Sequence, residues 1–411
     1  MDVLVVGGGA AGLLAAGMAA KRGHRVTVVE RNPRMARKVM ITGKGRCNVT
    51  NACSVQECVD NTPGNGRFLY SAFSAFPPQD VMSFFEEQGV PLKTERGNRV
   101  YPVSDKAVDI VDALVGFAKL QGCRFYSGRV MRLLIEDKQC IGVQVETGET
   151  LSADAVIVCT GGRSYPGTGS TGDGYTFAKQ AGHTIVPPRP SLVALEVEES
   201  WCKELQGLSL KNCAIAVQDT TNGKTIYTDF GEMLFTHFGI SGPIVLSASA
   251  HLRGTTPGRY CLSLDLKPAL KAEQIDARLL REFDAAPNAC LGNVLAALMP
   301  RSLVSVVLQL SGAAGETKCH SVSRTQRMRI GEILKDIPMT VSALRPFEEA
   351  VVTAGGVSTR EVNATTMESK LVKGLYFAGE LVDVDGTCGG YNLQWAWSSG
   401  YVAGKYAAQG K

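Results

Sequence analysis

The chain has no stretch long and apolar enough to cross a membrane as a helix. Such a span needs roughly 18 or more consecutive apolar residues, and none occurs among the 411 residues. The N-terminus starts with an apolar segment of strand type, not with a basic region followed by a signal-peptide core. None of the 12 cysteines forms a C-x-x-C pair or a metal-ligand pattern. These absences predict a cytoplasmic protein with reduced thiols and no metal site.

A strong excess of charge is also missing. The chain carries 43 basic and 39 acidic residues, so the net charge of +4 argues neither for nor against nucleic acid. Its 45% hydrophobic and 20% charged residues are typical of a soluble globular enzyme. The length is too great for one ordinary core and predicts two or three domains.

The 45 glycines, in contrast, are many, and the first cluster organises the N-terminus. Residues 3–6 are an apolar strand, residues 7–12 match G-x-G-x-x-G, residues 13–21 favour a helix, and residues 25–29 form a second strand that ends at Glu30. This strand, turn, helix, strand and acid is the pattern of a dinucleotide-binding unit.

Each glycine of this pattern, and the acid that ends it, has a physical role. Gly7 allows the sharp turn, Gly9 lets the backbone approach a pyrophosphate, and Gly12 lets the helix pack on the sheet. The helix N-terminus attracts phosphate, and Glu30 can accept hydrogen bonds from ribose hydroxyls while repelling a 2′-phosphate. The unit therefore suits FAD or NAD, whereas the alternative is a glycine loop that merely turns.

A second constellation lies near the C-terminus. An apolar strand ends at Gly379-Glu380, and a helix is expected from about Leu393 to Ala408. We expect Glu380 to hydrogen-bond a ribityl hydroxyl, and the N–H groups of Asn392 and Leu393 to face the pyrimidine end of a flavin, where negative charge develops on reduction. Alone this could be a plain strand–helix turn, but paired with residues 1–30 it favours FAD.

The expected secondary structure changes twice between these two glycine-rich motifs. Short alternating strands are expected from Leu192 to Leu266, and helical spacing dominates from Lys271 to Lys335. The proline run 187–190 is interpreted as a linker. The α/β pattern returns after Pro338, so the middle of the chain is interpreted as an insertion.

Several long motifs resemble the BaiN-like (YhiN-like) family of bacterial NAD(P)/FAD-dependent oxidoreductases, and the resemblance covers essentially the whole chain. These motifs are TGKGRCNVTN at 42–51, TAGGV at 353–357, MESK at 367–370, GLYFAGE at 374–380 and DVDGTCGGYNLQWAWSSG at 383–400.

The resemblance implies an α/β fold with a Rossmann-like FAD-binding domain of the glutathione-reductase type, interrupted by a β-barrel and a small helical domain. We place the discontinuous FAD-binding domain at 1–190 and 339–411, the β-barrel at 191–268 and the helical insertion at 269–338. The best described family activity is the reduction of ring double bonds in oxo-bile acids, and names such as aminoacetone oxidase also circulate.

The predicted FAD contacts come from the glycine turns, the basic loop after residue 37, one strand and the start of the last helix. They are Gly7, Gly9, Ala10, Ala11, Gly12, Glu30, Arg31, Lys38, Thr42, Gly43, Gly45, Arg46, Cys47, Asn48, Val130, Thr160, Gly161, Gly379, Glu380, Gly390, Asn392 and Leu393.

The basic loop 38–48 has three interpretations. Lys44 and Arg46 can neutralise a pyrophosphate or an anionic flavin, which is the favoured one. A solvated loop and a nucleic-acid patch are the alternatives, but no aromatic residues interleave the charges as single-strand binding would need.

Cysteines near the expected cofactor were also considered. Cys53 and Cys58 have the spacing of the redox pair in flavin disulfide reductases, but the flanking glycines are missing, so two ordinary thiols are favoured. Cys47 and Cys388 lie inside expected cofactor loops and could face the flavin.

The second G-x-G-x-x-G, at 167–172, does not directly follow a strand and lacks a terminal acid. We interpret it as a loop over the flavin face or at a domain junction. Without a second complete unit there is no dedicated NAD(P) domain, so NADH or NADPH would bind transiently as electron donor in the substrate cleft.

Tyr391, His237 and Tyr165 are the candidate catalytic residues, as proton donors or stacking groups. For His237 a packed structural role is the stronger alternative.

We therefore expect an FAD-dependent reductase that delivers hydride from flavin N5 to an enone-type carbon of a small apolar, steroid-like or bile-acid-like substrate, in a cleft at the domain junction. The alternatives are an FAD oxidase or hydroxylase of an amine or aromatic, a flavin-dependent RNA-modifying or RNA-binding protein, and a flavin-bound sensor without turnover. The expected partner is a small molecule, with no stable nucleic acid and no membrane span.

Overall fold

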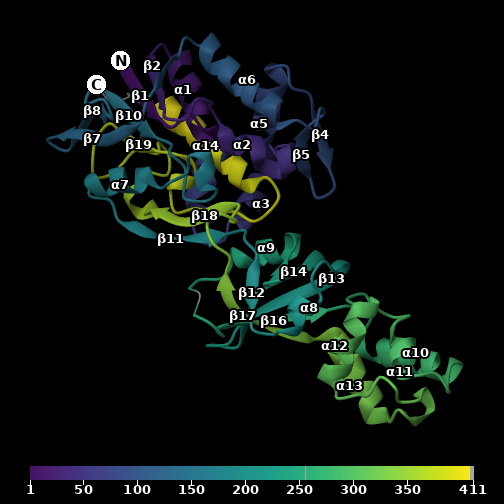
Figure 1. Ribbon diagram of the computed structural model, residues 1–411. Coiled ribbons are helices and arrows are strands. Elements are labelled where there is room, and N and C mark those ends of the chain that lie inside the picture. The colour runs from purple at the N-terminus through teal and green to yellow at the C-terminus, as the bar shows by residue number, and fades with distance from the viewer. Residues whose placement is uncertain (255, 408–411) are drawn as a thin grey trace. The chain divides into compact units, whose positions relative to one another are not determined.

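The computed structural model describes residues 1–254 and 256–407, and the chain divides into two compact units. Unit 1 contains Met1–Ser191 and Pro346–Lys411, and unit 2 contains Leu192–Arg345 (Figure 1). In the described ranges, no helix is long and apolar enough to cross a membrane.

A five-stranded parallel sheet is the centre of unit 1. Its order is β19-β10-β1-β2-β6. Nearly every residue of the three neighbouring strands β19, β10 and β1 is buried, as parallel strands covered on both faces require. The strands are β1 Asp2–Val6, β2 Arg25–Glu30, β6 Arg124–Ser127, β10 Ala155–Val158 and β19 Leu375–Phe377.

Three smaller sheets complete unit 1. They are the antiparallel sheet β3 Thr50–Asn51, β5 Arg99–Pro102 and β4 Leu92–Glu95, the meander β7 Val130–Glu136, β8 Gln139–Val145 and β9 Thr150–Ser152, and the pair β11 Ile185–Ser191 and β18 Val352–Val357. The α-helices are α1 Ala10–Lys21, α2 Arg37–Ile41, α3 Val55–Asp60, α4 Tyr70–Ala75, α5 Pro78–Glu87, α6 Ala107–Leu120, α7 Asp173–Gln180 and α14 Tyr391–Tyr406.

The proline run 187–190 is not a linker, as the sequence suggested, but part of strand β11. β11 pairs antiparallel with β18, and its register shifts between Val186 and Arg189. Proline is tolerated in a two-stranded pair with an irregular register because the missing N–H groups are not needed in a regular ladder. The last helix also differs slightly from expectation, since it begins at Tyr391 rather than Leu393; Ala408, its expected end, lies outside the described residues.

Unit 2 combines a closed barrel with a group of helices. The barrel has the order β12-β15-β14-β13-β16-β17. Its strands are β12 Leu195–Val197, β13 Ser209–Asp219, β14 Lys224–Thr236, β15 Gly239–Ser241, β16 Tyr260–Asp265 and β17 Ile337–Leu344.

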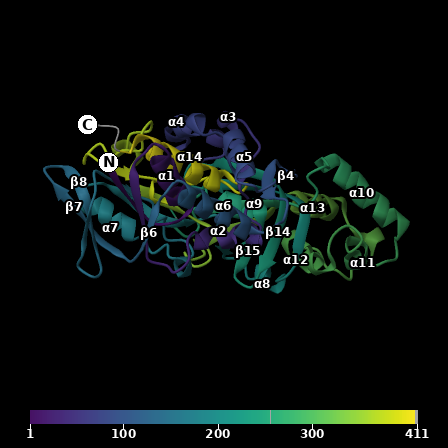
Figure 2. The same cartoon turned by 90° about the horizontal axis from the view of Figure 1, so that it is seen from above.

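The helices of unit 2 fall into two sets. Short helices α8 Trp201–Glu204 and α9 Pro243–Ser249 contact barrel strands. Four others gather together in both views (Figures 1 and 2): α10 Ala272–Ala285, α11 Leu291–Leu295, α12 Arg301–Ser311 and α13 Arg324–Lys335. Because β17 is a barrel strand, the segment up to Arg345 groups with unit 2 and not, as we had placed residues 339–345, with the first domain.

Helices α1 and α14 pack with their backbones in close contact, and both views show them side by side (Figures 1 and 2). A Cβ at Gly400 would lie 2.4 Å from the carbonyl oxygen of Ala11, and one at Gly404 would lie 2.3 Å from that of Ala15. Both distances are far below van der Waals contact. The two helices that follow the first and last glycine turns can therefore approach only because α14 carries glycine at these positions.

Replacing Gly400 with alanine tests this packing. Gly400→Ala is expected to destabilise the protein by about 1–3 kcal/mol or more, because the added methyl must push backbone against backbone. The measurement is urea-induced unfolding of the purified protein.

Gly116→Ala is the matched control. Gly116 is an exposed glycine within α6, and a Cβ there would meet nothing within 4 Å. This substitution should leave stability unchanged or raise it by up to about 1 kcal/mol through helix propensity. Equal effects of the two substitutions would contradict the packing argument.

Candidate functional site

Three glycine turns meet at one edge of the main sheet. Residues 7–12 follow β1, residues 160–162 follow β10, and Gly379-Glu380 follows β19. These strands are parallel neighbours in the order β19-β10-β1, so their carboxyl ends lie at the same edge. In open parallel sheets this is the edge where ligands bind.

The first turn is shaped for close approach of a ligand. Gly7 has φ +102°, and a Cβ there would lie 2.6 Å from the Cys159 carbonyl oxygen; a Cβ at Gly12 would lie 1.9 Å from the Gly7 carbonyl oxygen. At Gly9, by contrast, a Cβ would meet nothing within 4 Å. Two glycines are thus required by packing, and the third leaves open space beside the backbone.

Helix α1 begins directly after this open space. Gly9 is its N-cap residue, and in the described chain no side chain caps it. The N–H groups of Ala10 and Ala11, at the positive end of the helix dipole, therefore have no side-chain partner of that kind. This arrangement fits the pyrophosphate of a dinucleotide cofactor.

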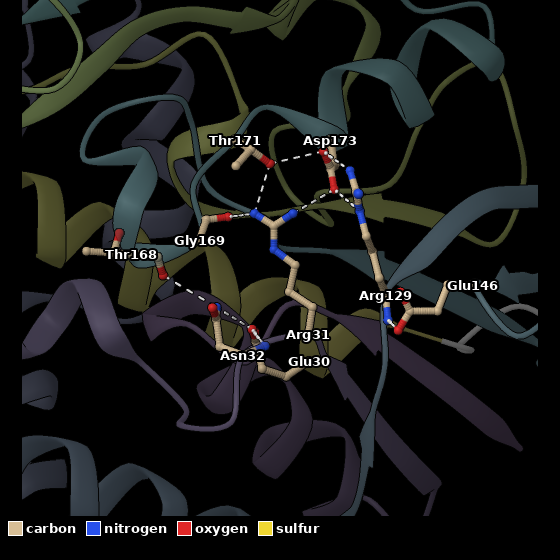
Figure 3. A network of polar contacts seen from close by, with 9 residues as sticks. All are labelled: Glu30, Arg31, Asn32, Arg129, Glu146, Thr168, Gly169, Thr171 and Asp173. Atoms are coloured by element: carbon tan, nitrogen blue, oxygen red, sulfur yellow. Dashed lines mark hydrogen bonds and ion pairs between the residues drawn. The ribbon is translucent and has the colours of Figure 1, made fainter.

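Glu30, at the end of β2, is 8% exposed, and Figure 3 shows it beside Asn32. Its carboxylate accepts hydrogen bonds from the backbone N–H of Gly8 at 2.7 Å and from both the backbone and the side-chain N–H groups of Asn32 at 2.8 and 2.7 Å. These bonds hold the carboxylate beside the glycine turn, where the sequence predicts the adenosine ribose.

Arg31 ties the second glycine-rich loop to this end of the site (Figure 3). Its guanidinium pairs with Asp173 at 3.0 Å and donates to Thr171 Oγ1 at 2.8 Å and to the Gly169 carbonyl. Arg129 pairs with the same carboxylate at 3.0 Å. Burial raises the pKa of Asp173, but the two arginines and Thr171 outweigh it, so the pKa is lowered and the carboxylate stays charged.

The loop 167–172 therefore lies beside Glu30–Asn32, and its place over the flavin face or at a domain junction remains a prediction. A Cβ at Gly169, which has φ +110°, would lie 2.4 Å from Asn32 Nδ2. Val130, a predicted cofactor contact, is the buried first residue of β7 and follows Arg129 directly.

Glu380 is the centre of a second network. Its carboxylate pairs with Lys38 at 2.6 Å and accepts hydrogen bonds from the Ser164 hydroxyl at 2.7 Å and the Thr353 N–H at 2.8 Å. Burial raises the pKa of Glu380, but the Lys38 ammonium and these hydrogen bonds outweigh it, so the pKa lies below its ordinary value. Its predicted contact with a ribityl hydroxyl remains a prediction.

Thr353 extends the network to the turn after β10. Its hydroxyl accepts hydrogen bonds from the N–H groups of Arg163 and Ser164 at 2.8 and 3.0 Å. A Cβ at Gly162 would lie 2.4 Å from the same oxygen. Four segments of unit 1 are thus fixed to one carboxylate: α2, the turns after β10 and β19, and strand β18.

Part of the positive charge of the basic loop 38–48 is compensated by carboxylates from other segments. Arg46 pairs with Asp105 at 2.6 Å and with Glu95, and its guanidinium lies 4.1 Å from the ring centroid of Tyr101. Because two carboxylates already compensate this charge, the geometry favours a structural role over the predicted pyrophosphate contact. Lys44 is exposed.

The next two residues connect this loop to the last helix. Cys47 is buried, and burial raises its thiol pKa to about 12, so the thiol stays protonated at neutral pH. Asn48, in the orientation that satisfies its side-chain amide, accepts a hydrogen bond from the Gly390 N–H at 3.0 Å. Thr42, Gly43 and Gly45 belong to the preceding segment Thr42–Gly45, which is kinked by left-handed backbone conformations at Gly43 and Lys44.

The N-terminus of α14 is held by backbone and amide contacts. Gly390, its N-cap, has φ +103°, and a Cβ there would lie 2.4 Å from the Thr50 carbonyl oxygen. The Asn392 side chain accepts from the Gly386 N–H and donates to the Gly386 carbonyl, both at 2.8 Å. Asn392 therefore fixes the preceding loop with its side chain, which leaves its predicted cofactor contact to the backbone; Leu393 follows it, half-buried.

The three candidate catalytic residues lie in different settings. Tyr391 is the first residue of α14, is 9% exposed, and has its pKa raised to about 12 by burial. Tyr165 is half-buried with φ +49°, a conformation uncommon for tyrosine. His237 belongs to unit 2, on the exposed turn between β14 and β15, where it contacts the Phe238 ring edge to face at a centroid distance of 4.9 Å. All three roles remain predictions.

Several residues of the two networks were not singled out from the sequence: Arg129, Ser164, Asp173 and Thr353. Two of them lie in or close to motifs that were singled out: Ser164 follows the Gly161-Gly162 turn, and Thr353 opens the TAGGV motif. Their side chains could not be assigned because their partners are distant in sequence. Among the residues the structure describes, no group of three or more His, Cys, Asp or Glu side chains could hold a metal ion.

The fold and these turns define a class: the chain is a flavoprotein, an FAD-dependent oxidoreductase with a Rossmann-type cofactor domain. It belongs to the HI0933-like family, whose "HI0933-like protein Rossmann domain" model matches residues 1–406. The family resemblance and the fold class predicted from the sequence are confirmed.

Three relatives match nearly the whole chain. The 3-dehydro-bile acid delta(4,6)-reductase of Clostridium scindens is 33% identical over 410 residues and is covered to 98%, as is this chain. The ribosomal RNA dihydrouridine synthase of Escherichia coli is 31% identical over 401 residues, 98% of this chain and 96% of the relative. The enzyme of that name in Haemophilus influenzae is 32% identical over 410 residues, 97% and 96% of the two chains.

Solved structures show the same fold at low sequence identity. A 3-ketosteroid delta1-dehydrogenase from Sterolibacterium denitrificans superposes with a TM-score of 0.51 and 14% identity, covering 100% of this chain and 99% of the other. Mycobacterium smegmatis Sdh1 gives a TM-score of 0.51 with 19% identity, covering 99% and 67%.

The Lys38–Glu380 pair gives a testable prediction. Lys38→Met is expected to destabilise the protein by about 3 kcal/mol, because it leaves a largely buried carboxylate without its cation. Lys38→Met/Glu380→Gln should recover more than half of that loss, since no charge is then left unpaired. Urea unfolding measures each variant.

The same pair sets a pH dependence and has a natural control. Because the folded-state pKa of Glu380 is lowered, its stabilisation is present above the ordinary value of 4.5 and is lost as pH falls below it.

Arg25→Met, which breaks the exposed Arg25–Asp2 pair, should change stability little. An equally large loss for Arg25→Met, or no recovery in the double variant, would contradict the assignment.

Proposed function

We propose that this enzyme reduces a ring carbon–carbon double bond conjugated to a carbonyl group, with NADH or NADPH as the transient electron donor. The supporting observation is the meeting of the first glycine turn and the Gly379-Glu380 turn at one sheet edge, where helix α14 is bonded to Gly379 through Trp395 and Ser399. These are the parts that hold the two ends of FAD in two-dinucleotide flavoproteins. When bound, FAD supplies the hydride.

The reaction class is supported by the shared chemistry of the relatives. A delta(4,6)-reductase of a 3-oxo bile acid and a dihydrouridine synthase both saturate a ring double bond conjugated to a carbonyl, judged by their names. Reduction of an enone double bond by hydride adds the hydride at the electron-poor carbon conjugated to the carbonyl, and a proton must then be supplied to the neighbouring carbon or to the carbonyl oxygen. The enzyme must therefore place an acid near the flavin site.

We propose Tyr391 as that acid. It is the first residue of the helix whose N-terminus is expected to face the flavin, and burial keeps its hydroxyl protonated at neutral pH. A protonated phenol can donate to the substrate carbonyl or to the α-carbon. Glu380, charged and bound to Lys38, is a poor proton donor but a suitable anchor for a cofactor hydroxyl.

A small steroid-like enone is the first proposed substrate, on the strength of the bile-acid reductase relative. A uridine in ribosomal RNA is the second candidate, because two relatives with that activity in their names are 31% and 32% identical over nearly the whole chain. These identities are too close to 33% to separate the two substrates.

One anaerobic experiment tests the function. The FAD-loaded protein is mixed with NADH or NADPH and the flavin absorbance is followed. The reduced protein then receives either a 3-oxo-Δ4 steroid or unmodified ribosomal RNA, and products are identified by mass spectrometry. We expect bleaching by a nicotinamide donor and return of the colour with an enone substrate. If neither substrate is consumed and the colour returns only when air is admitted, the reductase proposal is overturned in favour of an oxidase.

Tyr391→Phe tests the acid. We expect kcat for the accepted substrate to fall by about 100-fold or more with little change in FAD binding, because only the hydroxyl is removed. Tyr401→Phe is the control: Tyr401 lies on the same helix and stacks on Phe76 at 4.5 Å, a contact that phenylalanine keeps. Unchanged kcat in Tyr391→Phe would exclude Tyr391 as the donor.

A further inference from the structure

Two thiols lie in contact at the start of helix α3. The Sγ atoms of Cys53 and Cys58 are 3.4 Å apart. No disulfide joins them, and each is a free cysteine. A disulfide bond is about 2.05 Å long, so bonding needs an approach of roughly 1.4 Å.

The local sequence explains this contact. Ser54 is the N-cap of α3, and its hydroxyl accepts a hydrogen bond from the Glu57 N–H at 3.2 Å, while the Glu57 carboxylate accepts one from the Ser54 N–H at 2.8 Å. This capping box places Cys53 just before the N-cap and Cys58 on the fourth helical position. Apolar side chains at these two positions commonly pack together and fix how the chain enters the helix. Here the pair consists of two oxidisable sulfurs.

The two sulfurs differ in accessibility and acidity, as an attacking and a resolving thiol do. Cys53 is half-buried and Cys58 is fully buried. The hydrogen bond from Cys58 lowers the pKa of Cys53, whereas the same bond and burial raise the pKa of Cys58. The accessible sulfur is therefore also the one more readily ionised.

The pair lies next to the loop that leads into α14. The Cys53 N–H donates to the Asn51 carbonyl at 2.9 Å, and the Asn51 side chain donates to the Gly389 carbonyl at 3.0 Å. At the other end of α3, the Thr387 N–H donates to the Asn61 carbonyl at 2.8 Å. Beyond burial, negative charge on either sulfur raises the pKa of Tyr391.

We propose that Cys53 and Cys58 are a reversible dithiol–disulfide pair that reacts with low-molecular-weight disulfides. The Cys53 thiolate attacks one sulfur of the disulfide RSSR, which forms a mixed disulfide and releases RS⁻. Cys58, after losing its proton to solvent, attacks the Cys53 sulfur and releases the second RS⁻. In total, two cysteine thiols and RSSR give one protein disulfide and two RSH, so the protein is oxidised by two electrons.

The proposal does not depend on the substrate of the enzyme. It places a redox change beside Tyr391 and the loop 386–390. This loop contacts Asn51 and Asn61, which stand at the two ends of the segment that carries the two cysteines. The competing interpretation is that the two cysteines serve only as an apolar contact at the helix start.

The test uses oxidised glutathione on the folded full-length protein, followed by alkylation and peptide mapping by mass spectrometry. In the wild type we expect a Cys53–Cys58 disulfide that dithiothreitol reverses. Cys58→Ser should stop at a glutathione adduct on Cys53, and Cys53→Ser should leave Cys58 reduced.

Cys261 is the internal reference, since it is also half-buried but burial raises its pKa. We expect the Cys53 thiol of the wild-type protein to be lost at least about tenfold faster than Cys261 is modified, in line with its greater acidity. Cys261→Ser should still form the Cys53–Cys58 disulfide.

Two results would overturn the proposal. One is a wild-type protein in which Cys53 and Cys58 stay reduced while Cys261 is modified. The other is Cys58→Ser without a Cys53 adduct. If a serine variant does not fold, as a thermal melt would show, the wild-type peptide map decides alone, because it needs no substitution.

Discussion

Helices α1 and α14 can touch only because the side of α14 that faces α1 has glycine at 400 and 404, where a methyl group would enter the carbonyl oxygens of Ala11 and Ala15. This contact lets elements from the two ends of the chain share one site. The turn at Gly379 reaches the same place, since a Cβ there would lie 3.0 Å from Ala11 Cβ. Without this approach, the two halves of the cofactor site would each be an ordinary strand–turn–helix.

The polar networks build on that contact. Glu380 joins α2, β18 and two of the three turns, while Glu30, Arg31 and Asp173 join the first turn to the loop 167–172. The Glu380 carboxylate beside Lys38 and the Asp173 carboxylate beside Arg31 and Arg129 are both largely buried, and their cations keep the pKa of each low, which is how burial of charge is tolerated. The backbone around the site is therefore fixed before any cofactor group is bound.

The relatives of this chain act on different substrates, and the predicted flavin contacts lie in one part of the structure. The residues predicted to contact the flavin all belong to unit 1. The relatives share a conjugated ring double bond but differ between a bile acid and ribosomal RNA. Under the proposed function, the glycine turns hold the cofactor, and other surfaces select the substrate.

The sequence alone determined the cofactor fold, because glycine spacing, apolar strands and a terminal acid are local patterns set by backbone sterics and the helix dipole. Periodicity also indicated the short strands and the helices of unit 2, and the family resemblance implied that these strands form a barrel. The sequence could not determine that Arg46 pairs with Glu95 and Asp105, that the proline run is a strand, or that β17 completes the barrel. Those outcomes depend on distant partners: Glu95 lies 49 residues from Arg46, and Thr353 lies 163 residues from Pro190. Tertiary structure decided them because a side chain's charge or a strand's pairing is assigned only when the chain brings its distant partner within reach.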